Sequence, residues 1–181
     1  MRAVALAIIA SLAAAAQLSA GGETSAFIFP RIAKYGGIVA LSDAAEQPQA
    51  GAKVVFDITA ASGPEEISKG LESVARYLNL HAQAGRAPTE VKLALVLHGQ
   101  ATKVALQDDA YARVSGAKTN PNRELLGKLK GAGVEVYVCG QSLARNKYPV
   151  ADVAPEVTLA VSAMTVNVNK QLDGYAYLAI H

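Results

Sequence analysis

Cysteine is nearly absent from this chain of 181 residues, which contains only one, Cys139. A single cysteine cannot form an internal disulfide, and the sequence has no Cys/His cluster with the spacing of zinc ligands, so we expect no metal site. Tryptophan is absent and aromatic residues make up 6% of the chain, which argues against a single-strand nucleic-acid binder. The 17 basic and 15 acidic residues nearly balance, so neither nucleic acid nor an anionic membrane is an expected partner.

Nucleotide-binding motifs are missing as well. Neither G-x-G-x-x-G nor G-x-x-x-x-G-K-[ST] occurs, and we expect no organic cofactor. What the chain does have is apolar character, with 51% hydrophobic and 18% charged residues. That composition is typical of one compact domain with a large core.

The first twenty residues predict a secretory signal peptide. Arg2 precedes an apolar run at residues 3–16, and the small residues Ser19 and Ala20 follow it. About fourteen apolar residues suit a signal peptide, whereas a membrane-spanning helix needs roughly twenty. We expect cleavage after Ala20 or, alternatively, within residues 13–16, followed by release into the periplasm without a membrane anchor. A retained N-terminal anchor helix is the other interpretation.

The rest of the chain divides into an N-terminal arm and one α/β domain. Residues 21–52 are rich in Gly, Ala and Pro and are too short to form their own core, so we expect an irregular arm packed on the domain. Short apolar runs then alternate with helical patterns, which predicts a three-layer α/β/α sandwich with a mostly parallel sheet of about five strands. The expected strands are 53–59, 91–97, 134–138, 157–162 and 175–180, and the expected helices lie near 62–85, 102–115, 121–130, 140–146 and 163–172.

The first of these helices is expected to begin at the segment Ser62-Gly63-Pro64-Glu65-Glu66. It offers a capping serine, a proline near the first helical position, and acidic residues in the first turn. Apolar residues at three- and four-residue spacing follow this segment, and Gly85 is a suitable stop.

Two candidate reactive residues follow predicted strands directly. His98 comes after the strand at 91–97, and Cys139 comes after the strand at 134–138. In open α/β sheets, ligands bind beyond the carboxyl ends of the strands, so these side chains are expected to share one crevice. For His98, the alternative is a neutral imidazole that is hydrogen-bonded at a strand end.

The sequence leaves two interpretations of Cys139 open. A thiol with a pKa near 8.5 is only a few per cent ionised at neutral pH, but a helix beginning at Gly140 or Gln141 would stabilise the thiolate. Gly140 would also allow a partner to approach the sulfur, and Arg145 or Lys147 would add positive potential. Alternatively, Cys139 is an inert core residue, since free cysteine is among the most buried residue types. A Cys-His hydrolase is disfavoured because no third member of a triad is evident.

Several segments together resemble the DsrE/DsrF-like family, in its exported single-domain branch. The most specific is VEVYVCGQSLARN at residues 134–146, supported by LVLHG at 95–99 and NPN at 120–122. The resemblance covers residues 53–181. It implies an α/β/α sandwich of five parallel strands, assembly into trimers or hexamers and, in the sulfur-relay members, a cysteine that carries sulfur as a persulfide.

Residue by residue, Cys139 matches the sulfur-carrying cysteine of that family. Four further residues match recurrent positions of the exported branch: His98, Gly99, Asn120 and Gln141. The expected function is a sulfur carrier or sulfurtransferase that takes sulfur from a donor and passes it to an acceptor protein or small thiol. Relay members act in the cytoplasm with dedicated subunits, whereas this chain is expected to be exported, so those partners are not carried over. The alternative is a non-catalytic periplasmic small-ligand-binding or assembly module with a structural cysteine.

Overall fold

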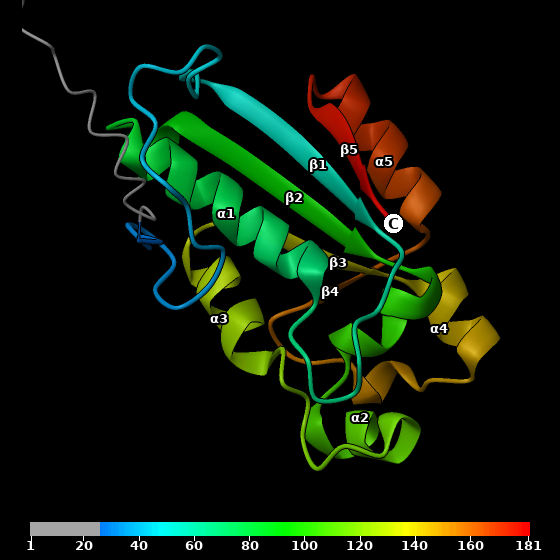
Figure 1. Cartoon of the computed structure of the whole chain (residues 1–181). Helices are drawn as coiled ribbons and strands as arrows, with labels where there is room; N and C mark the ends of the chain where they lie inside the picture. The colour runs from blue at the N-terminus through cyan, green and yellow to red at the C-terminus, as the bar shows by residue number, and fades with distance from the viewer. Residues whose placement is uncertain (1–25) are drawn as a thin grey trace, which may run out of the picture.

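Five strands form one parallel sheet in the order β4-β3-β2-β1-β5 (Figure 1). The structure is a computed structural model that describes residues 26–181. The strands are β1 (Ala52–Ile58), β2 (Val91–Leu97), β3 (Glu135–Cys139), β4 (Thr158–Ala160) and β5 (Ala176–Ile180). The predicted signal peptide, residues 1–20, lies outside the described residues, as do residues 21–25 of the predicted arm.

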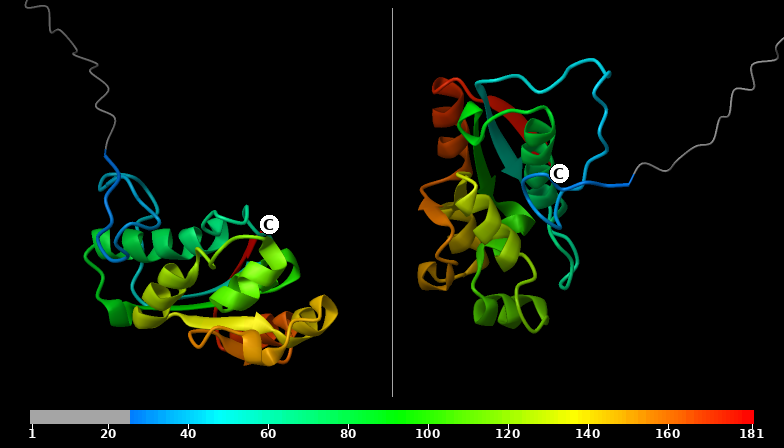
Figure 2. Two further views of the ribbon diagram at one scale, coloured as in Figure 1. Left: turned by 90° about the horizontal axis from the view of Figure 1, so that it is seen from below. Right: turned by 90° about the vertical axis from the view of Figure 1, so that its left-hand side faces the viewer.

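Helices cover both faces of this sheet. They are α1 (Lys69–Gln83), α2 (Asp108–Ser115), α3 (Arg123–Gly131), α4 (Gly140–Asn146) and α5 (Ala163–Leu172), with short 3-10 helices at Pro88–Glu90, Gly99–Ala105 and Val150–Asp152. Helices α1 and α3 pack on one face and α5 packs on the other, as the view along the sheet shows (Figure 2, left). The predicted three-layer sandwich is therefore confirmed. Within residues 26–181, none of the helices has the length and apolar character that crossing a bilayer requires.

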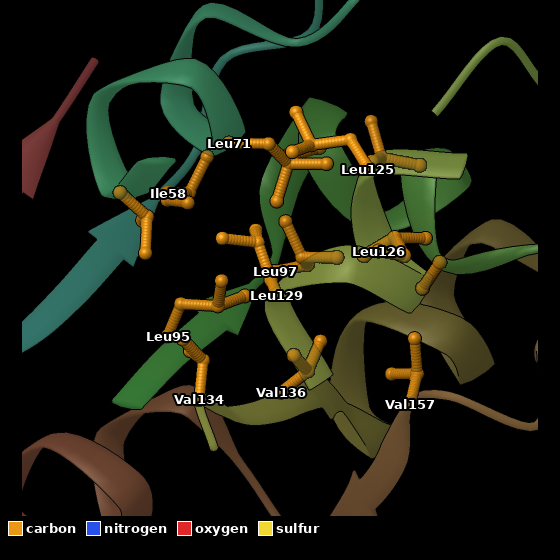
Figure 3. Close-up of a cluster of buried hydrophobic side chains, with 14 of the residues drawn as sticks. Ile58, Leu71, Leu95, Leu97, Leu125, Leu126, Leu129, Val134, Val136 and Val157 are labelled. Carbon is orange, nitrogen blue, oxygen red and sulfur yellow. The ribbon is translucent and has the colours of Figure 1, made fainter. Parts of the chain in front are cut away.

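The larger core lies between the sheet and helices α1 and α3 (Figure 3). Strands β1 and β2 are nearly continuous apolar runs because both of their faces are covered, as expected for the centre of a parallel sheet. A smaller cluster fills the face under α5 and includes Val55, Ala94, Val96, Cys139, Ala163 and Val166. Cys139 is therefore on the face that α5 covers.

Helix α1 begins later than the sequence pattern predicted. Its N-cap is Ser68, whose hydroxyl accepts a hydrogen bond from the Leu71 backbone at 3.4 Å, so the prediction that the helix begins at residues 62–66 is wrong. These residues instead form a separate turn in which the Glu66 carboxylate accepts from the Gly63 N–H at 3.0 Å. Glu66 is thus used within the turn, whereas the Ser62 hydroxyl accepts from the N–H of Lys69, the first residue of α1, at 3.3 Å, so Ser62 still satisfies one N–H of a helix that begins after Ser68.

One buried amide connects the described part of the arm to α1. The Asn79 side chain is fully buried, and both its oxygen and its amide group form hydrogen bonds with the backbone of the arm. Its oxygen accepts from the N–H groups of Arg31 and Ile32, and its amide donates to the carbonyls of Tyr35 and Gly36, all at 2.8 to 2.9 Å. The irregular arm thus gains from one side chain the backbone hydrogen bonds that secondary structure would otherwise supply.

Candidate active site

The site is formed by side chains at the carboxyl ends of three neighbouring strands. In the register of the sheet, Asp57 of β1 lies beside Val96 of β2, which lies beside Tyr137 of β3. His98 and Cys139 are each two residues further along, and side chains two apart on a strand point to the same face. The alternation of the strands therefore places Asp57, His98 and Cys139 together on the α5 side of the sheet.

These three residues line one open pocket of about 860 Å³. Its walls come from α4, from α5 with the residues that precede it, and from β5. The remaining lining residues are Gln141, Ser142, Arg145, Val161, Ser162, Ala163, Met164, Asn167, Val168, Gln171 and Tyr177. Cys139 is 4% exposed and lies at the base of the pocket. The structure thus brings together His98 and Cys139, as the strand-end rule predicted.

The surroundings of Cys139 favour its thiolate. Burial by itself raises the pKa of the thiol, but hydrogen bonding from the backbone of Ala163, from the hydroxyl and backbone of Ser142, and from the backbone of Gln141 outweighs burial and lowers the pKa below its ordinary value. Gln141 and Ser142 belong to the first turn of α4, and Ala163 is the first residue of α5. The free N–H groups of two helix beginnings therefore converge on one sulfur atom.

His98 is held by the carboxylate of Asp57. The distance from His98 Nε2 to Asp57 Oδ1 is 2.7 Å. This hydrogen bond, which outweighs the effect of burial, raises the pKa of His98, and the charges of Asp57 and Cys139 act in the same direction. Because Nε2–H donates to a carboxylate, Nδ1 is the nitrogen that remains to gain or lose a proton.

Asp57 is a buried carboxylate that stays ionised. Burial disfavours its charge, but hydrogen bonds from His98, Tyr177 and Asn167 outweigh burial and lower the pKa of Asp57 to about 2. The Tyr177 hydroxyl donates to Oδ2 at 2.6 Å, and this bond is the main cause of the raised pKa of Tyr177. Strand β5 and helix α5 thus each contribute one donor that fixes the carboxylate beneath His98.

A serine hydroxyl connects the start of α4 with the segment that follows β2. Ser142 Oγ accepts a hydrogen bond from the Gly99 N–H at 3.3 Å, and the same hydroxyl favours the thiolate of Cys139. Gly99 has a φ of 56°, a left-handed conformation that side chains disfavour. Gln141, also predicted, lines the pocket, and its amide donates to the Val161 carbonyl at 3.3 Å.

Gly140 is needed for a different contact from the one we expected. A Cβ atom at this position would lie 3.0 Å from the Ala160 carbonyl oxygen and 3.4 Å from that of Val161. The glycine therefore lets the end of β4 approach the start of α4. That close approach brings the β4–α5 connection, and with it the Ala163 N–H, up to the cysteine.

Asn120 lies outside the pocket. Its side chain is buried and donates to the carbonyls of Val104 and Leu106 at 2.9 and 2.7 Å, while its oxygen accepts from the Asn122 backbone and side chain. These bonds hold the segment that follows β2 against the start of α3. Asn120 therefore acts on the fold of the β2–α3 connection, and it does not line the pocket around Cys139.

Sequence reasoning missed four of the residues that shape the site: Asp57, Ser142, Asn167 and Tyr177. A signal for Asp57 was present, because it is the only charged residue within the apolar run VVFDI and an aspartate buried in a strand needs a partner. Its partner His98 could be named only once the two strands were known to be neighbours. Asp57 orients His98, and it is the third residue beside Cys139 and His98 that was not evident from the sequence.

Within residues 26–181, no group of three or more His, Cys, Asp and Glu side chains is arranged to hold a metal ion. His98 instead pairs with Asp57, and Cys139 is hydrogen-bonded by the backbone of α4 and α5 and by the Ser142 hydroxyl. The arrangement suits proton transfer and nucleophilic attack by sulfur.

Comparison with known proteins places these residues in a wider context. The family model described as the DsrE/DsrF-like family matches residues 53–180. A solved structure titled "Structure of Protein of Unknown Function MTH1491 from Methanobacterium thermoautotrophicum" is similar with a TM-score of 0.54 and 21% sequence identity, over 71% of this chain and 99% of that chain. At this identity the similarity shows a shared fold alone. Comparison with curated proteins gave no match.

Proposed function

The chain belongs to the DsrE/DsrF-like family, and we propose that it is a sulfur carrier or sulfurtransferase that holds sulfane sulfur as a persulfide on Cys139. The observation that carries this proposal is the position of the thiol. Cys139 lies at the base of an open pocket, where the N–H groups of two helix beginnings lower its pKa. A thiolate is the reactive form in sulfur transfer, and the chemistry needs no metal or organic cofactor.

In the loading step, the Cys139 thiolate attacks the outer sulfur of a donor persulfide, R–S–SH. A new S–S bond forms to Sγ, the S–S bond of the donor breaks, and the donor leaves as R–S⁻ with the electron pair. Protonated His98 gives its Nδ1 proton to this leaving thiolate, which becomes R–SH. Cys139 then carries –S–SH, and no net oxidation or reduction has taken place.

In the unloading step, neutral His98 takes the proton from an acceptor thiol. The resulting thiolate attacks the outer sulfur of the Cys139 persulfide, so the Sγ–S bond breaks and the acceptor gains –SH on its sulfur. Cys139 returns as a thiolate, stabilised by the backbone of Gln141, Ser142 and Ala163. Asp57 keeps His98 oriented and favours its protonated form throughout the cycle.

We further propose that the protein acts in the periplasm after removal of residues 1–20 and that it forms a homo-oligomer. The apolar run at residues 3–16 supports export. An oligomer is supported by large apolar side chains that remain exposed, among them Leu159, Val161 and Leu178. The donor is a persulfide and the acceptor is a thiol, each carried by a protein or a small molecule that can reach the base of the pocket.

A second candidate is a non-catalytic small-ligand-binding or assembly module in which Cys139 is structural. The observation that favours it is the near-complete burial of the cysteine, which packs with Val55, Ala94 and Val96. The rate of thiol alkylation as a function of pH separates the two candidates. An inflection well below 8.5 supports the sulfur carrier, whereas an inflection near 8.5 or an unreactive thiol supports the structural role.

Loading itself is tested by intact mass measurement after incubation with inorganic polysulfide and removal of the excess. The wild-type chain is expected to gain the mass of one sulfur atom, which a reducing agent removes. Cys139→Ser is the matched control because it keeps the size of the side chain, and it is expected to gain nothing. A wild-type chain that stays unmodified under this and other sulfane-sulfur donors would refute the proposal.

A further inference from the structure

The pocket above Cys139 is larger than a small inorganic sulfur species requires. Its volume is about 860 Å³, and it extends along α5 from Met164 to Gln171. At a rise of 1.5 Å per residue, the distance along the helix from Met164 to Gln171 is roughly 10 Å. A sulfide or thiosulfate ion bound at Cys139 would leave most of that length empty.

The α5 wall of this pocket is mainly apolar. Met164 and Val168 are four residues apart and therefore lie on one side of the helix, and Val161 precedes them on the same wall. These side chains are 74%, 54% and 73% exposed, respectively, so the protein itself leaves the wall uncovered. A ligand with an apolar body would remove this surface from water.

The α4 wall carries a cation. Gln141, Ser142 and Arg145 share the pocket-facing side of α4, and Arg145 is exposed. Within residues 26–181, Arg145 takes part in none of the ion pairs that the other charged side chains form. His98 is already paired with Asp57, which leaves Arg145 as the lining cation without a carboxylate partner. A guanidinium group of this kind suits a carboxylate on the ligand.

We propose that the sulfur donor is a small organic persulfide with an apolar body and a carboxylate, and that inorganic sulfur species are poor substitutes for it. The inference rests on the proposed function, because it names the donor class for the same pocket. The outer sulfur of the donor reaches Cys139, its apolar body contacts Met164 and Val168 of α5, and its carboxylate pairs with Arg145 of α4. The bonds formed and broken are those of the loading step above.

Three organic persulfides and inorganic polysulfide distinguish the parts of this proposal, with loading of Cys139 followed by intact mass. Mercaptohexanoate persulfide has both the apolar body and the carboxylate, mercaptohexanol persulfide lacks the charge, and thioglycolate persulfide lacks the apolar length. Inorganic polysulfide lacks both. Loading at low donor concentration is expected to be roughly tenfold more efficient with mercaptohexanoate than with thioglycolate persulfide, because several additional methylene groups become partly buried.

Two pairs of variants assign the effect to the two walls. Arg145→Gln is expected to reduce loading by mercaptohexanoate persulfide about threefold and to leave mercaptohexanol persulfide unaffected, as for an exposed ion pair. Its control is Lys147→Gln, which removes an exposed cation just beyond α4. Val168→Gln is expected to reduce the loading efficiency of the two mercaptohexyl donors relative to thioglycolate persulfide. Its control is Leu172→Gln, one turn further along α5 and outside the pocket lining, which is expected to leave this ratio unchanged.

The possible results separate this inference from the proposed function. Suppose that polysulfide and all three organic persulfides load Cys139 equally well, and that neither Arg145→Gln nor Val168→Gln changes this. The donor class proposed here is then wrong, and the sulfur-carrier function stands. If none of the four donors loads Cys139, the proposed function itself fails. Preferential loading by mercaptohexanoate persulfide that falls about threefold with Arg145→Gln supports both.

Discussion

The ion pair between Asp57 and His98 yields the sharpest prediction, through the substitution Asp57→Asn. The carboxylate of Asp57 is buried and bonds to His98 Nε2 at 2.7 Å and to the Tyr177 hydroxyl at 2.6 Å. Asparagine keeps the shape of the side chain but removes the charge that both bonds use. The perturbation therefore tests the electrostatics of the pair with little change in packing.

The size of the effect on stability follows from the pKa of Asp57. A fall from the ordinary value of 3.8 to about 2 corresponds to roughly 2 kcal/mol of folding free energy at neutral pH, which is also the range measured for a hydrogen bond to a charged group. For a domain of this size, 2 kcal/mol lowers Tm by roughly 4 to 8 °C. Asp43→Asn, which removes an exposed carboxylate from the arm, is the control and is expected to change Tm by less than about 2 °C.

The difference in free energy of unfolding between wild type and Asp57→Asn is expected to shrink at both acid and basic pH. The pKa of Asp57 is lowered on folding, so its contribution is present above 3.8 and is lost as the pH falls through about 2. The pKa of His98 is raised from 6.5, so its contribution is present below 6.5 and is lost as the pH rises through its folded value. Urea unfolding should therefore show the largest difference between pH 4 and 6.5.

The same substitution is expected to change the titration of His98. Without the Asp57 carboxylate, the imidazole loses the hydrogen bond and charge that raise its pKa while burial still lowers it, so the pKa of His98 should fall. Proton NMR of the imidazole ring as a function of pH measures this directly. An unchanged pKa of His98, or a stability difference that is the same at pH 5 and pH 9, would refute the reasoning.

Three further substitutions test the parts of the site and of the fold. Ser142→Ala removes a hydroxyl that favours the thiolate, so the pKa of Cys139, measured by alkylation rate against pH, is expected to rise. Gly140→Ala puts a Cβ atom 3.0 Å from a carbonyl oxygen and should cost about 1 to 2 kcal/mol in thermal unfolding, whereas Gly127→Ala, which meets no neighbour within 4 Å, should be neutral or stabilising. Asn79→Ala leaves four backbone groups of the arm without their partner, so we expect a loss of roughly 3 kcal/mol and rapid proteolytic cleavage in the arm.

Much of the sheet could be predicted from the sequence because its central strands are long apolar runs. The run at 91–97 matches β2 at both ends, since a strand covered on both faces is apolar at all but one position, Lys92, and stands out from the polar segments on either side. The junction at Cys139 was also predictable, because an apolar run there gives way to a helical pattern. The fourth strand, Thr158–Ala160, is shorter than predicted because it pairs only with the last three residues of β3 and because Ser162 already caps α5.

The start of α1 was harder to predict because two serines compete for the capping position. Ser62 is followed by proline and two acids, whereas Ser68 is followed by a plainer pattern. The decision depends on a distant contact, since the Ser68 N–H donates to Asn122 at 2.7 Å and so holds that residue at the end of α1. A contact between residues 54 positions apart cannot be predicted from the sequence around Ser68.

The partners within the site depend on strand order, which is a property of the whole chain. Tyr177 reaches Asp57 because β5, the last strand, pairs with β1, the first one. Helix α5 makes that connection by crossing the sheet on the face opposite α1, and it brings Ala163 to Cys139 and Asn167 to Asp57. Sequence reasoning identified the cysteine and the histidine, but the residues that tune them come from elements far away in the chain.

The most direct test of the central claim is one complete cycle of sulfur transfer followed by intact mass. The wild-type protein is loaded with a persulfide donor, freed of donor, and then incubated with an acceptor thiol. The account predicts that the chain gains the mass of one sulfur atom on Cys139 and loses it again as the acceptor becomes a persulfide, while Cys139→Ser shows neither change. A wild-type chain that never gains the sulfur, or that holds it and cannot pass it to any thiol, would contradict the account.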